Sequence, residues 1–174
     1  MNRKLIKKYS TFWLTLKYDI TYLATFVKLK INQNKKIMVI GYTTGVFDLF
    51  HIGHLIMLKN AKSLCDKLIV GVPTDELVSY KNKNPVIPFE ERLEIVRSIK
   101  YVDAAIPQYS MDKFDAWNKL KFDVMFVGDD WYNTSKWIEF EKQFKEVGVK
   151  IIYFPYTKGT SSTIINQTLQ MIRG

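Results

Sequence analysis

Short apolar runs alternate with amphipathic stretches along most of this chain, from residue 37 onward. Runs rich in β-branched and aromatic residues are typical of buried strands, whereas apolar residues three and four positions apart are typical of helices. This pattern predicts strands at 37–42, 67–72, 102–106, 123–127 and 149–154, and helices at 53–65, from Pro88, and at 111–120, 136–147 and 161–172. Apolar strands that alternate with helices predict a five-stranded parallel α/β sheet covered by helices on both faces. In such a sheet a ligand binds at the carboxyl ends of the strands, where the strand order reverses.

The first 36 residues follow a different pattern. Apolar side chains recur there at helical spacing, at Leu5, Tyr9, Phe12, Leu16, Ile20, Leu23 and Val27. The longest apolar region is interrupted by Lys17 and Asp19, and no small-residue cleavage site follows it, so neither a transmembrane helix nor a signal peptide is expected. The prediction is an N-terminal amphipathic helix that ends near 32–34, outside the main body of the fold.

Charge strengthens this division. The 174 residues carry a formal net charge of +9, of which residues 1–36 contribute +8 and the other 138 residues only +1. A basic surface spread over the fold is therefore not indicated, and nucleic acid is not an expected partner. Two interpretations of the basic helix remain open. Its apolar face packs on the domain or on a second copy of the chain, or the helix lies on an anionic membrane surface.

The single cysteine, Cys65, excludes an internal disulfide and fits a reducing compartment, so a cytoplasmic protein is expected, with peripheral membrane attachment if the helix binds lipid. Because Cys65 falls at the end of an apolar helix face, it is interpreted as a packing residue and not as a nucleophile.

The strongest chemical motif follows the first predicted strand. His51 and His54, the only histidines in the chain, flank Gly53 where a helix is predicted to begin. Unsatisfied N–H groups and the helix dipole attract anions at a helix N-terminus. Two imidazoles at the same place could donate hydrogen bonds to charge developing on a phosphoryl oxygen, while Gly53 would allow close approach of backbone and phosphate. The motif therefore predicts a polyphosphate site.

His51-Ile52-Gly53-His54 resembles the HxGH motif of the nucleotidyltransferase superfamily. The same four letters occur in class I aminoacyl-tRNA synthetases, but this chain is far too short for that class and has no KMSKS-like loop. Further segments resemble the bacterial glycerol-3-phosphate cytidylyltransferases in order and spacing: 74–76, 81–83, 91–92, 101–103, Gly128-Asp129-Asp130-Trp131 and Gly159-Thr160-Ser161-Ser162-Thr163. The resemblance implies a Rossmann-like doubly wound fold, with a catalytic domain at 37–174 that follows the 1–36 extension.

The same resemblance implies the residues of the site. Catalysis would use His51, His54 and Lys83. The CTP site would comprise Val46, Phe47, Asp48, His51, Ile52, Gly53, His54, Lys83, Gly128, Asp129, Tyr156, Thr157, Lys158, Gly159, Thr160, Ser161, Ser162 and Thr163. Lys81 and Lys113 would bind the acceptor phosphate. The alternatives without a ligand-binding role are that the lysines at 81 and 83 are solvated surface residues and that 161–163 only cap a helix.

The implied reaction transfers CMP from CTP to glycerol-3-phosphate or a close polyol phosphate, giving CDP-glycerol and pyrophosphate for capsule or teichoic-acid synthesis. Mg²⁺ would bind mainly through the CTP phosphates. Asp48 would orient an imidazole or help to hold the metal ion. The family resemblance also implies a homodimer with 101–103 near its interface, and Trp131 would form a wall of the site.

Several positions depart from the family pattern. Tyr156 stands where these enzymes typically have Arg, Ile164 where they have Lys, and Val46 where they have Thr. Three hypotheses stay open: this cytidylyltransferase or one that uses a related polyol phosphate, an adenylyltransferase of the same fold, and a non-enzymatic CTP-binding subunit. Arg92 follows two acidic residues, so an intrahelical ion pair and a substrate contact are equally expected there.

Overall fold

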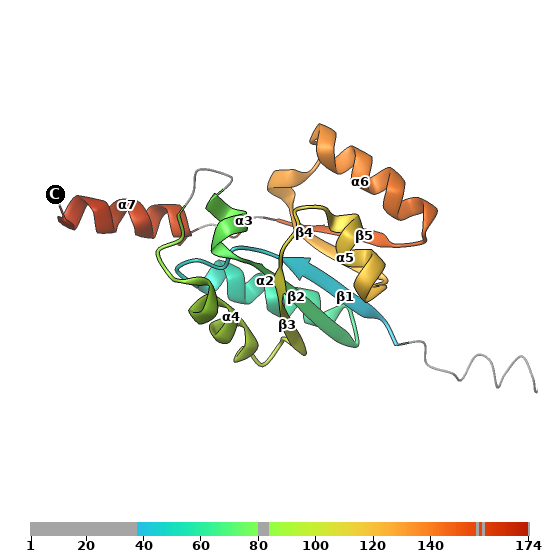
Figure 1. The fold of residues 1–174 in the computed structure, drawn as a ribbon, viewed down its shortest axis with the longest axis horizontal. Coiled ribbons are helices and arrows are strands. Elements are labelled where there is room, and N and C mark those ends of the chain that lie inside the picture. The colour runs from blue at the N-terminus through green and yellow to red at the C-terminus, as the bar shows by residue number, and fades with distance from the viewer. Residues whose placement is uncertain (1–37, 80–83, 156, 158, 174) are drawn as a thin grey trace, which may run out of the picture. The chain divides into compact units, whose positions relative to one another are not determined.

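A five-stranded parallel sheet forms the centre of the body in the computed structural model, which describes residues 38–79, 84–155, 157 and 159–173 (Figure 1). The strands are β1 (Ile40–Thr44), β2 (Lys67–Pro73), β3 (Ala104–Gln108), β4 (Val124–Gly128) and β5 (Lys150–Phe154). The helices are α2 (Ile52–Ser63), α3 (Asp75–Ser79), α4 (Phe89–Arg97), α5 (Lys113–Leu120), α6 (Ser135–Glu146) and α7 (Ser162–Arg173), with a 3₁₀ turn, η1, at Asp129–Trp131. The Rossmann-like α/β fold predicted from the sequence is confirmed.

The strand order is β3-β2-β1-β4-β5. The chain builds outward from β1 to β3 and then returns to place β4 on the other side of β1. The order therefore reverses between β1 and β4, where Gly41 pairs with Val124 and Tyr42 with Met125. Loops that leave neighbouring strands in opposite directions open a crevice at this point, so the fold places a ligand site beyond Thr44 and Gly128.

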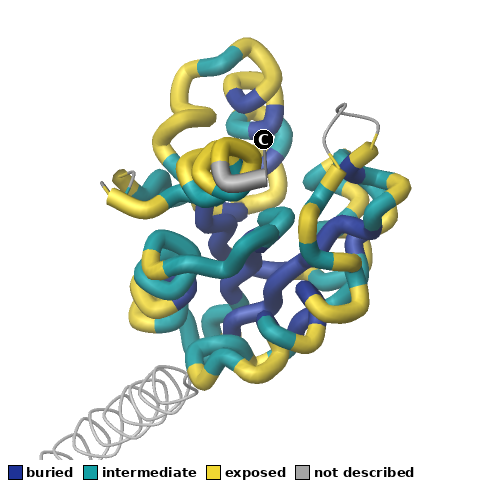
Figure 2. The backbone as a smooth tube through the Cα atoms, turned by 90° about the vertical axis from the view of Figure 1, so that its left-hand side faces the viewer, coloured by how far each residue is buried: buried dark blue, intermediate teal, exposed yellow. Residues whose placement is uncertain are grey.

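Alternating side chains of the strands face two cores. Leu68, Val70 and Val72 of β2 pack with α2 and α4, whereas Ile69 points to the opposite face. That second core is aromatic and contains Tyr42, Phe122, Trp137, Phe140 and Phe144, with α5 and α6 over it. The backbone is most deeply buried along these strands, and the outer faces of the helices are exposed (Figure 2). The doubly wound arrangement thus follows from strands that are apolar on both faces.

All predicted strands and helices of the body have observed counterparts. Two elements were not predicted, the short helix α3 and the turn η1. Cys65 lies just beyond α2 and not within it, but it packs against the core and its Sγ donates to the carbonyl oxygen of Ala61 at 3.3 Å. Its predicted packing role is therefore confirmed.

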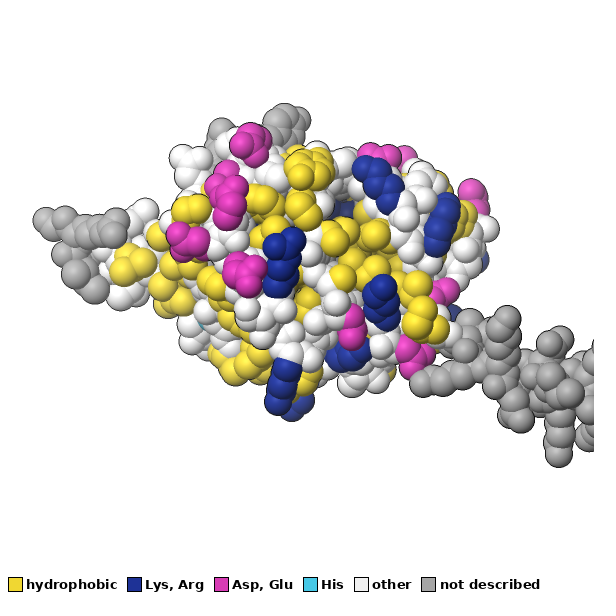
Figure 3. All heavy atoms as spheres, turned by 60° about the horizontal axis from the view of Figure 1, so that its bottom comes forward, with side chains coloured by type: hydrophobic (Ala, Val, Ile, Leu, Met, Phe, Trp, Pro, Cys, Tyr) yellow, Lys and Arg dark blue, Asp and Glu magenta, His cyan; other side chains and the backbone are white. Residues whose placement is uncertain are grey.

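The amphipathic helix predicted for residues 1–36 lies outside the described residues. Within the described part of the chain, no helix combines the length and the apolar character needed to cross a membrane. On the face drawn in Figure 3, lysine and arginine side chains of the body are interspersed with acidic ones and form no continuous basic stripe.

Candidate active site

The two histidines cap the first turn of α2. His51 is the N-cap residue, and its Nδ1 accepts a hydrogen bond from the backbone N–H of Gly53 at 3.1 Å. The Nδ1 of His54 in turn accepts the backbone N–H of His51 at 3.4 Å. This reciprocal pair has the form of a capping box, with imidazoles in place of the usual hydroxyl and carboxylate. The ring centroids lie 4.0 Å apart, so both side chains serve one place.

The cap also determines which ring nitrogen carries the proton. Since Nδ1 of each imidazole accepts a backbone N–H, the proton of each neutral ring is on Nε2. Each histidine therefore keeps its Nε2–H as the donor that the cap does not use. Gly53 is required for this geometry, because a Cβ there would lie 2.8 Å from Cε1 of His51. Gly53 therefore leaves room for the neighbouring ring, and its predicted close approach to phosphate stays a prediction.

Both histidines are held neutral at physiological pH. Burial, and secondly the proximity of His51, lower the pKa of His54 to about 4, although the Asp48 carboxylate opposes the shift. Burial also lowers the pKa of His51. The rings of Phe47 and Phe50 lie 5.3 and 5.4 Å from that of His54 and supply this apolar environment. At neutral pH each imidazole can therefore offer phosphate an uncharged N–H donor.

This depressed pKa predicts that the protein loses stability as the pH falls. Between the unfolded value near 6.5 and the folded value near 4, unfolded His54 binds a proton that the folded protein does not. The free energy of unfolding should therefore decrease through this interval. Urea unfolding at pH 7, 5.5 and 4.5 measures the slope, and His54→Gln should show a smaller slope than the wild type. Equal slopes would contradict the assignment of the shift to His54.

The loop that precedes α2 is strained and tightly held. Phe47 and Leu49 adopt positive φ angles of 54° and 47°, a conformation that is unfavourable for bulky residues unless the surroundings enforce it. Here the Asp48 carboxylate accepts the backbone N–H groups of Leu49, Val86 and Ile87 at 2.9–3.0 Å. Asp48 thus fixes the backbone, and its expected role of orienting an imidazole or helping to hold the metal ion stays a prediction. Phe47 is only 1% exposed, which leaves its backbone as the part available to a ligand.

Arg92 holds the loop that precedes α2 through buried hydrogen bonds. It is fully buried, and its guanidinium donates to the carbonyl oxygens of Ile87, Val46 and Pro73 at 2.9, 2.6 and 3.0 Å. Its ion-pair partner is Asp75 of α3, at 2.5 Å. The expected intrahelical ion pair is therefore wrong, and so is the expected substrate contact, because the side chain is enclosed by protein. Arg92 joins four segments and so positions the loop that carries the histidines.

The predicted hydroxyl cluster at the start of α7 is partly used by the fold. Ser161 Oγ accepts the backbone N–H of Ile164 at 3.2 Å, which is a helix cap, and Ser162 Oγ donates to the carbonyl oxygen of Asp48 at 2.7 Å. The second contact brings the N-terminus of α7 to the histidine loop. Thr163 lines a polar hollow beside Asp48 together with Ser162 and Asn84. The two helix N-termini and the loop between them thus surround a place suited to a triphosphate.

The remaining residues predicted to bind CTP are spread over several segments. Thr157 is near Gly53, since a Cβ on that glycine would approach its Cβ to 3.8 Å. Gly159 has a φ of 119°, while Thr160 and Ile52 are exposed. Asp129 belongs to η1, next to Gly128. Lys81, Lys83, Tyr156 and Lys158 lie outside the described residues, so their predicted contacts with CTP and the acceptor stay predictions.

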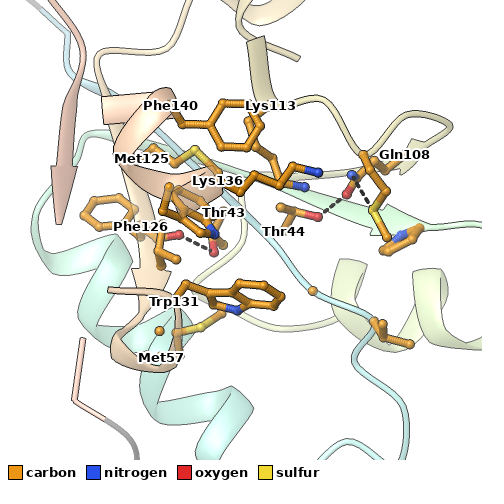
Figure 4. A pocket seen from close by; sticks show the side chains of 17 residues that line it. Thr43, Thr44, Met57, Gln108, Lys113, Met125, Phe126, Trp131, Lys136 and Phe140 are labelled. Atoms are coloured by element: carbon orange, nitrogen blue, oxygen red, sulfur yellow. Dashed lines mark hydrogen bonds between the residues drawn. The ribbon is translucent and has the colours of Figure 1, made fainter. Parts of the chain in front are cut away.

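A cavity of about 280 Å³ opens at the carboxyl ends of the central strands (Figure 4). Thr44 ends β1, Pro73 ends β2, Gln108 ends β3 and Gly128 ends β4, and all four line the cavity. Its apolar side is formed by residues of α2, β4, η1 and α6: Met57, Met125, Phe126, Trp131, Trp137 and Phe140. Trp131 thus lines this cavity, and its role as a wall of the CTP site stays a prediction. The cavity continues to Gly45 and Val46, the first residues of the histidine loop.

Two lysines give this cavity its charge. Lys113 is the first residue of α5 and Lys136 the second of α6, and their ammonium groups point toward Thr44 and Gln108 (Figure 4). No carboxylate is among the lining residues that the structure describes. A cation at a helix N-terminus opposes the helix dipole at a cost of about 0.3–1 kcal/mol, so two of them are better explained by an anionic ligand than by helix stability. Lys113 was predicted, and Lys136 was not.

The described residues do not form a protein cage for a metal ion, since no group of three His, Cys, Asp or Glu side chains is assembled among them. Both oxygens of Asp48 already accept backbone N–H groups. Mg²⁺ held mainly through the CTP phosphates, the usual mode for that ion in nucleotide sites, stays a prediction.

A doubly wound sheet with a pair of N-cap histidines facing a helix dipole defines a phosphate-transferring, nucleotide-binding class of protein. The model of the cytidylyltransferase-like family matches residues 42–168. The chain belongs to this family and is a nucleotidyltransferase.

Several named proteins are similar to this chain over most of its body. The glycerol-3-phosphate cytidylyltransferase of Staphylococcus aureus is 37% identical over 128 residues, which are 73% of this chain and 92% of that protein. An FAD synthase of Archaeoglobus fulgidus is 38% identical over 109 residues, 63% of this chain and 79% of that protein. A lipopolysaccharide core biosynthesis protein from Thermoplasma volcanium has a similar structure, with a TM-score of 0.61 at 28% identity over 71% of this chain and all of the other. Identity alone therefore does not separate cytidylyl from adenylyl transfer.

Proposed function

We propose that the protein transfers CMP from CTP to the phosphate of a small polyol phosphate, with glycerol-3-phosphate as the first candidate. The observation that carries this proposal is the cavity beside the histidine loop, with two lysines and no carboxylate among its described lining residues. A volume of about 280 Å³ lies just below the usual range of small-molecule pockets, roughly 300–1,000 Å³. It suits a three- to five-carbon polyol phosphate better than a flavin.

In this proposal an acceptor phosphate oxygen attacks the α-phosphorus of CTP in line. A bond forms between that oxygen and the α-phosphorus, the bond from the α-phosphorus to the bridging oxygen breaks, and pyrophosphate leaves with the electron pair. The acceptor phosphate is already ionised, so the attack needs no general base. No side chain becomes covalently attached, and the protein acts by positioning and by stabilising charge.

Each part of the site then has a role. The Nε2–H groups of His51 and His54 donate to the oxygens of the pentacovalent α-phosphate, whose negative charge is greatest in the transition state. The N-termini of α2 and α7 face the β and γ phosphates. Lys113 and Lys136 hold the acceptor phosphate, and the family resemblance adds Lys81 for that phosphate and Lys83 for the CTP phosphates. When bound, Mg²⁺ neutralises charge on the triphosphate.

The product of the reaction would be CDP-glycerol or a similar activated polyol, and we propose that it serves capsule or teichoic-acid polymer synthesis.

An adenylyltransferase is the second candidate, because FAD synthases match this chain about as well as the cytidylyltransferases do. The two candidates differ in the nucleotide and in the size of the acceptor.

Pyrophosphate release separates these candidates. The full chain is incubated with Mg²⁺ and each of the four nucleoside triphosphates, against glycerol-3-phosphate, ribitol-5-phosphate and flavin mononucleotide. The proposal predicts release with CTP and a polyol phosphate that exceeds every other pair by at least tenfold. Greater release with ATP, with either acceptor class, would establish the adenylyltransferase instead.

A further inference from the structure

Three polar side chains are linked by hydrogen bonds in a series that ends at the cavity. The last two of them form the cavity wall opposite the apolar wall. We call this series the hydrogen-bond chain. Tyr42 is buried within the sheet and is hydrogen-bonded with Thr44, two residues further along β1. The hydroxyl of Thr44 donates to Oε1 of Gln108, at the end of β3. Gln108 is only 7% exposed, and both Thr44 and Gln108 line the cavity. The hydrogen-bond chain thus connects the core of the sheet to the place where the lysine ammonium groups point (Figure 4).

The orientation of the Gln108 amide follows from its other contacts. Its Nε2 donates to the backbone carbonyl oxygen of Ser110 at 2.5 Å and also faces Sδ of Met111 at 4.0 Å. A carbonyl oxygen only accepts hydrogen bonds, so the NH₂ group must be on this side and Oε1 on the side of Thr44. Burial raises the pKa of Tyr42 to about 12, which keeps that hydroxyl protonated.

The proton count of the hydrogen-bond chain leaves only acceptor capacity toward the cavity. The Thr44 proton is used on Oε1 of Gln108, Tyr42 is buried and does not line the cavity, and the Gln108 NH₂ faces Ser110 and Met111. Oε1 of Gln108 accepts one hydrogen bond from Thr44 and has a second lone pair. Gly71 preserves the arrangement, since a Cβ there would lie 2.3 Å from the Tyr42 hydroxyl oxygen. This wall can therefore recognise a hydrogen-bond donor but offers none to an acceptor.

We propose that Gln108, held by Thr44 and Tyr42, is a specificity-determining residue for the acceptor and accepts a hydrogen bond from the hydroxyl next to its phosphorylated carbon. The inference rests on the proposed function. With the phosphate on Lys113 and Lys136, whose ammonium groups point toward Gln108, the hydroxyl at the adjacent carbon is the one brought to Oε1. The site then selects a secondary alcohol and rejects a ketone or a methylene group at that carbon.

Three acceptors of nearly equal size test this selection: glycerol-3-phosphate, dihydroxyacetone phosphate, which has a carbonyl at the same carbon, and 1,3-propanediol monophosphate, which has a methylene there. Wild-type protein is assayed with saturating CTP and Mg²⁺, and kcat/KM is compared. Both analogues should be poorer by about tenfold to a hundredfold, because each leaves the buried acceptor without its donor. Values within threefold of one another would overturn the proposal.

Variants distinguish recognition from general damage. Gln108→Leu and the nearly isosteric Thr44→Val should reduce the preference for glycerol-3-phosphate to less than about threefold while KM for CTP changes little. Tyr109→Ala, at an adjacent side chain that is 73% exposed and does not line the cavity, should keep the full preference. A uniform loss on all three acceptors in both variants would show a merely structural role. Absence of transfer to any polyol phosphate by the wild type would instead contradict the proposed function.

Discussion

His54→Asn should lower turnover by at least about two orders of magnitude, because one donor to a developing oxyanion is worth that much. Asn can reproduce the Nδ1 acceptor of His54, which receives the backbone N–H of His51, but it has no donor at the position of Nε2. The variant therefore separates the capping role from the catalytic one. Initial rates with saturating CTP and acceptor measure the loss, and urea unfolding verifies that the fold is retained.

His54→Gln is the matched control for this prediction. Its side-chain amide reaches the position of Nε2 and restores a donor there, while it loses the capping acceptor. It should be more active than His54→Asn and somewhat less stable, since loss of a helix cap costs about 1 kcal/mol. If the Asn variant keeps turnover within threefold of wild type, the assignment of Nε2 as the phosphate donor is wrong.

Arg92→Met should lower the free energy of unfolding by about 3–5 kcal/mol, because three carbonyl oxygens lose a buried donor and each buried group left unsatisfied costs about 1–3 kcal/mol. Met has a similar volume, so packing is largely preserved. The carbonyl oxygens of Val46, Pro73 and Ile87 lose this donor, whereas the partly exposed Asp75 carboxylate keeps the backbone N–H of Phe89. Arg92→Lys keeps the charge but cannot supply the planar fork, and it should fall between Met and wild type.

Arg97→Met provides the comparison on the same helix. Arg97 is about half exposed; its Nη1 lies 3.8 Å from a carboxylate oxygen of Glu94, and its Nε donates to the carbonyl oxygen of Ala105 at 3.4 Å. An exposed pair and one long hydrogen bond contribute little, so the variant should change the free energy of unfolding by less than about 1 kcal/mol. Equal effects of the two substitutions in urea unfolding would show that Arg92 does not anchor the loop.

The regular elements were predictable because their local patterns agree with their packing. Leu68, Val70 and Val72 form a buried run that no solvated helix would tolerate, and β2 lies where that run occurs. The small differences between the predicted and observed ends of the elements come from tertiary contacts. The third strand begins at Ala104 and not at Val102, because Asp103 turns back to accept the backbone N–H of Leu68 at 2.6 Å. The helix α3 has only five residues, too few to show helical periodicity.

The histidine pair could be predicted because its chemistry is local in sequence. The neighbours that complete the site come from distant segments and carry no pattern of their own. Arg92 follows two glutamates, which made an intrahelical pair the natural expectation, yet its partner Asp75 is 17 positions away. Gln108 and Lys136 resemble ordinary polar residues until the sheet brings their ends together. A lysine at the very start of a helix was the one available signal, since it opposes the helix dipole.

Transfer of label from CTP to a polyol phosphate tests the central claim most directly. The full chain is incubated with CTP labelled at the α-phosphate, Mg²⁺ and glycerol-3-phosphate or ribitol-5-phosphate, and the products are separated by chromatography. The account predicts that the label appears in a CDP-polyol and that the pyrophosphate formed carries none. Label that stays in CTP with every polyol phosphate, while labelled ATP gives an adenylylated product, would contradict it.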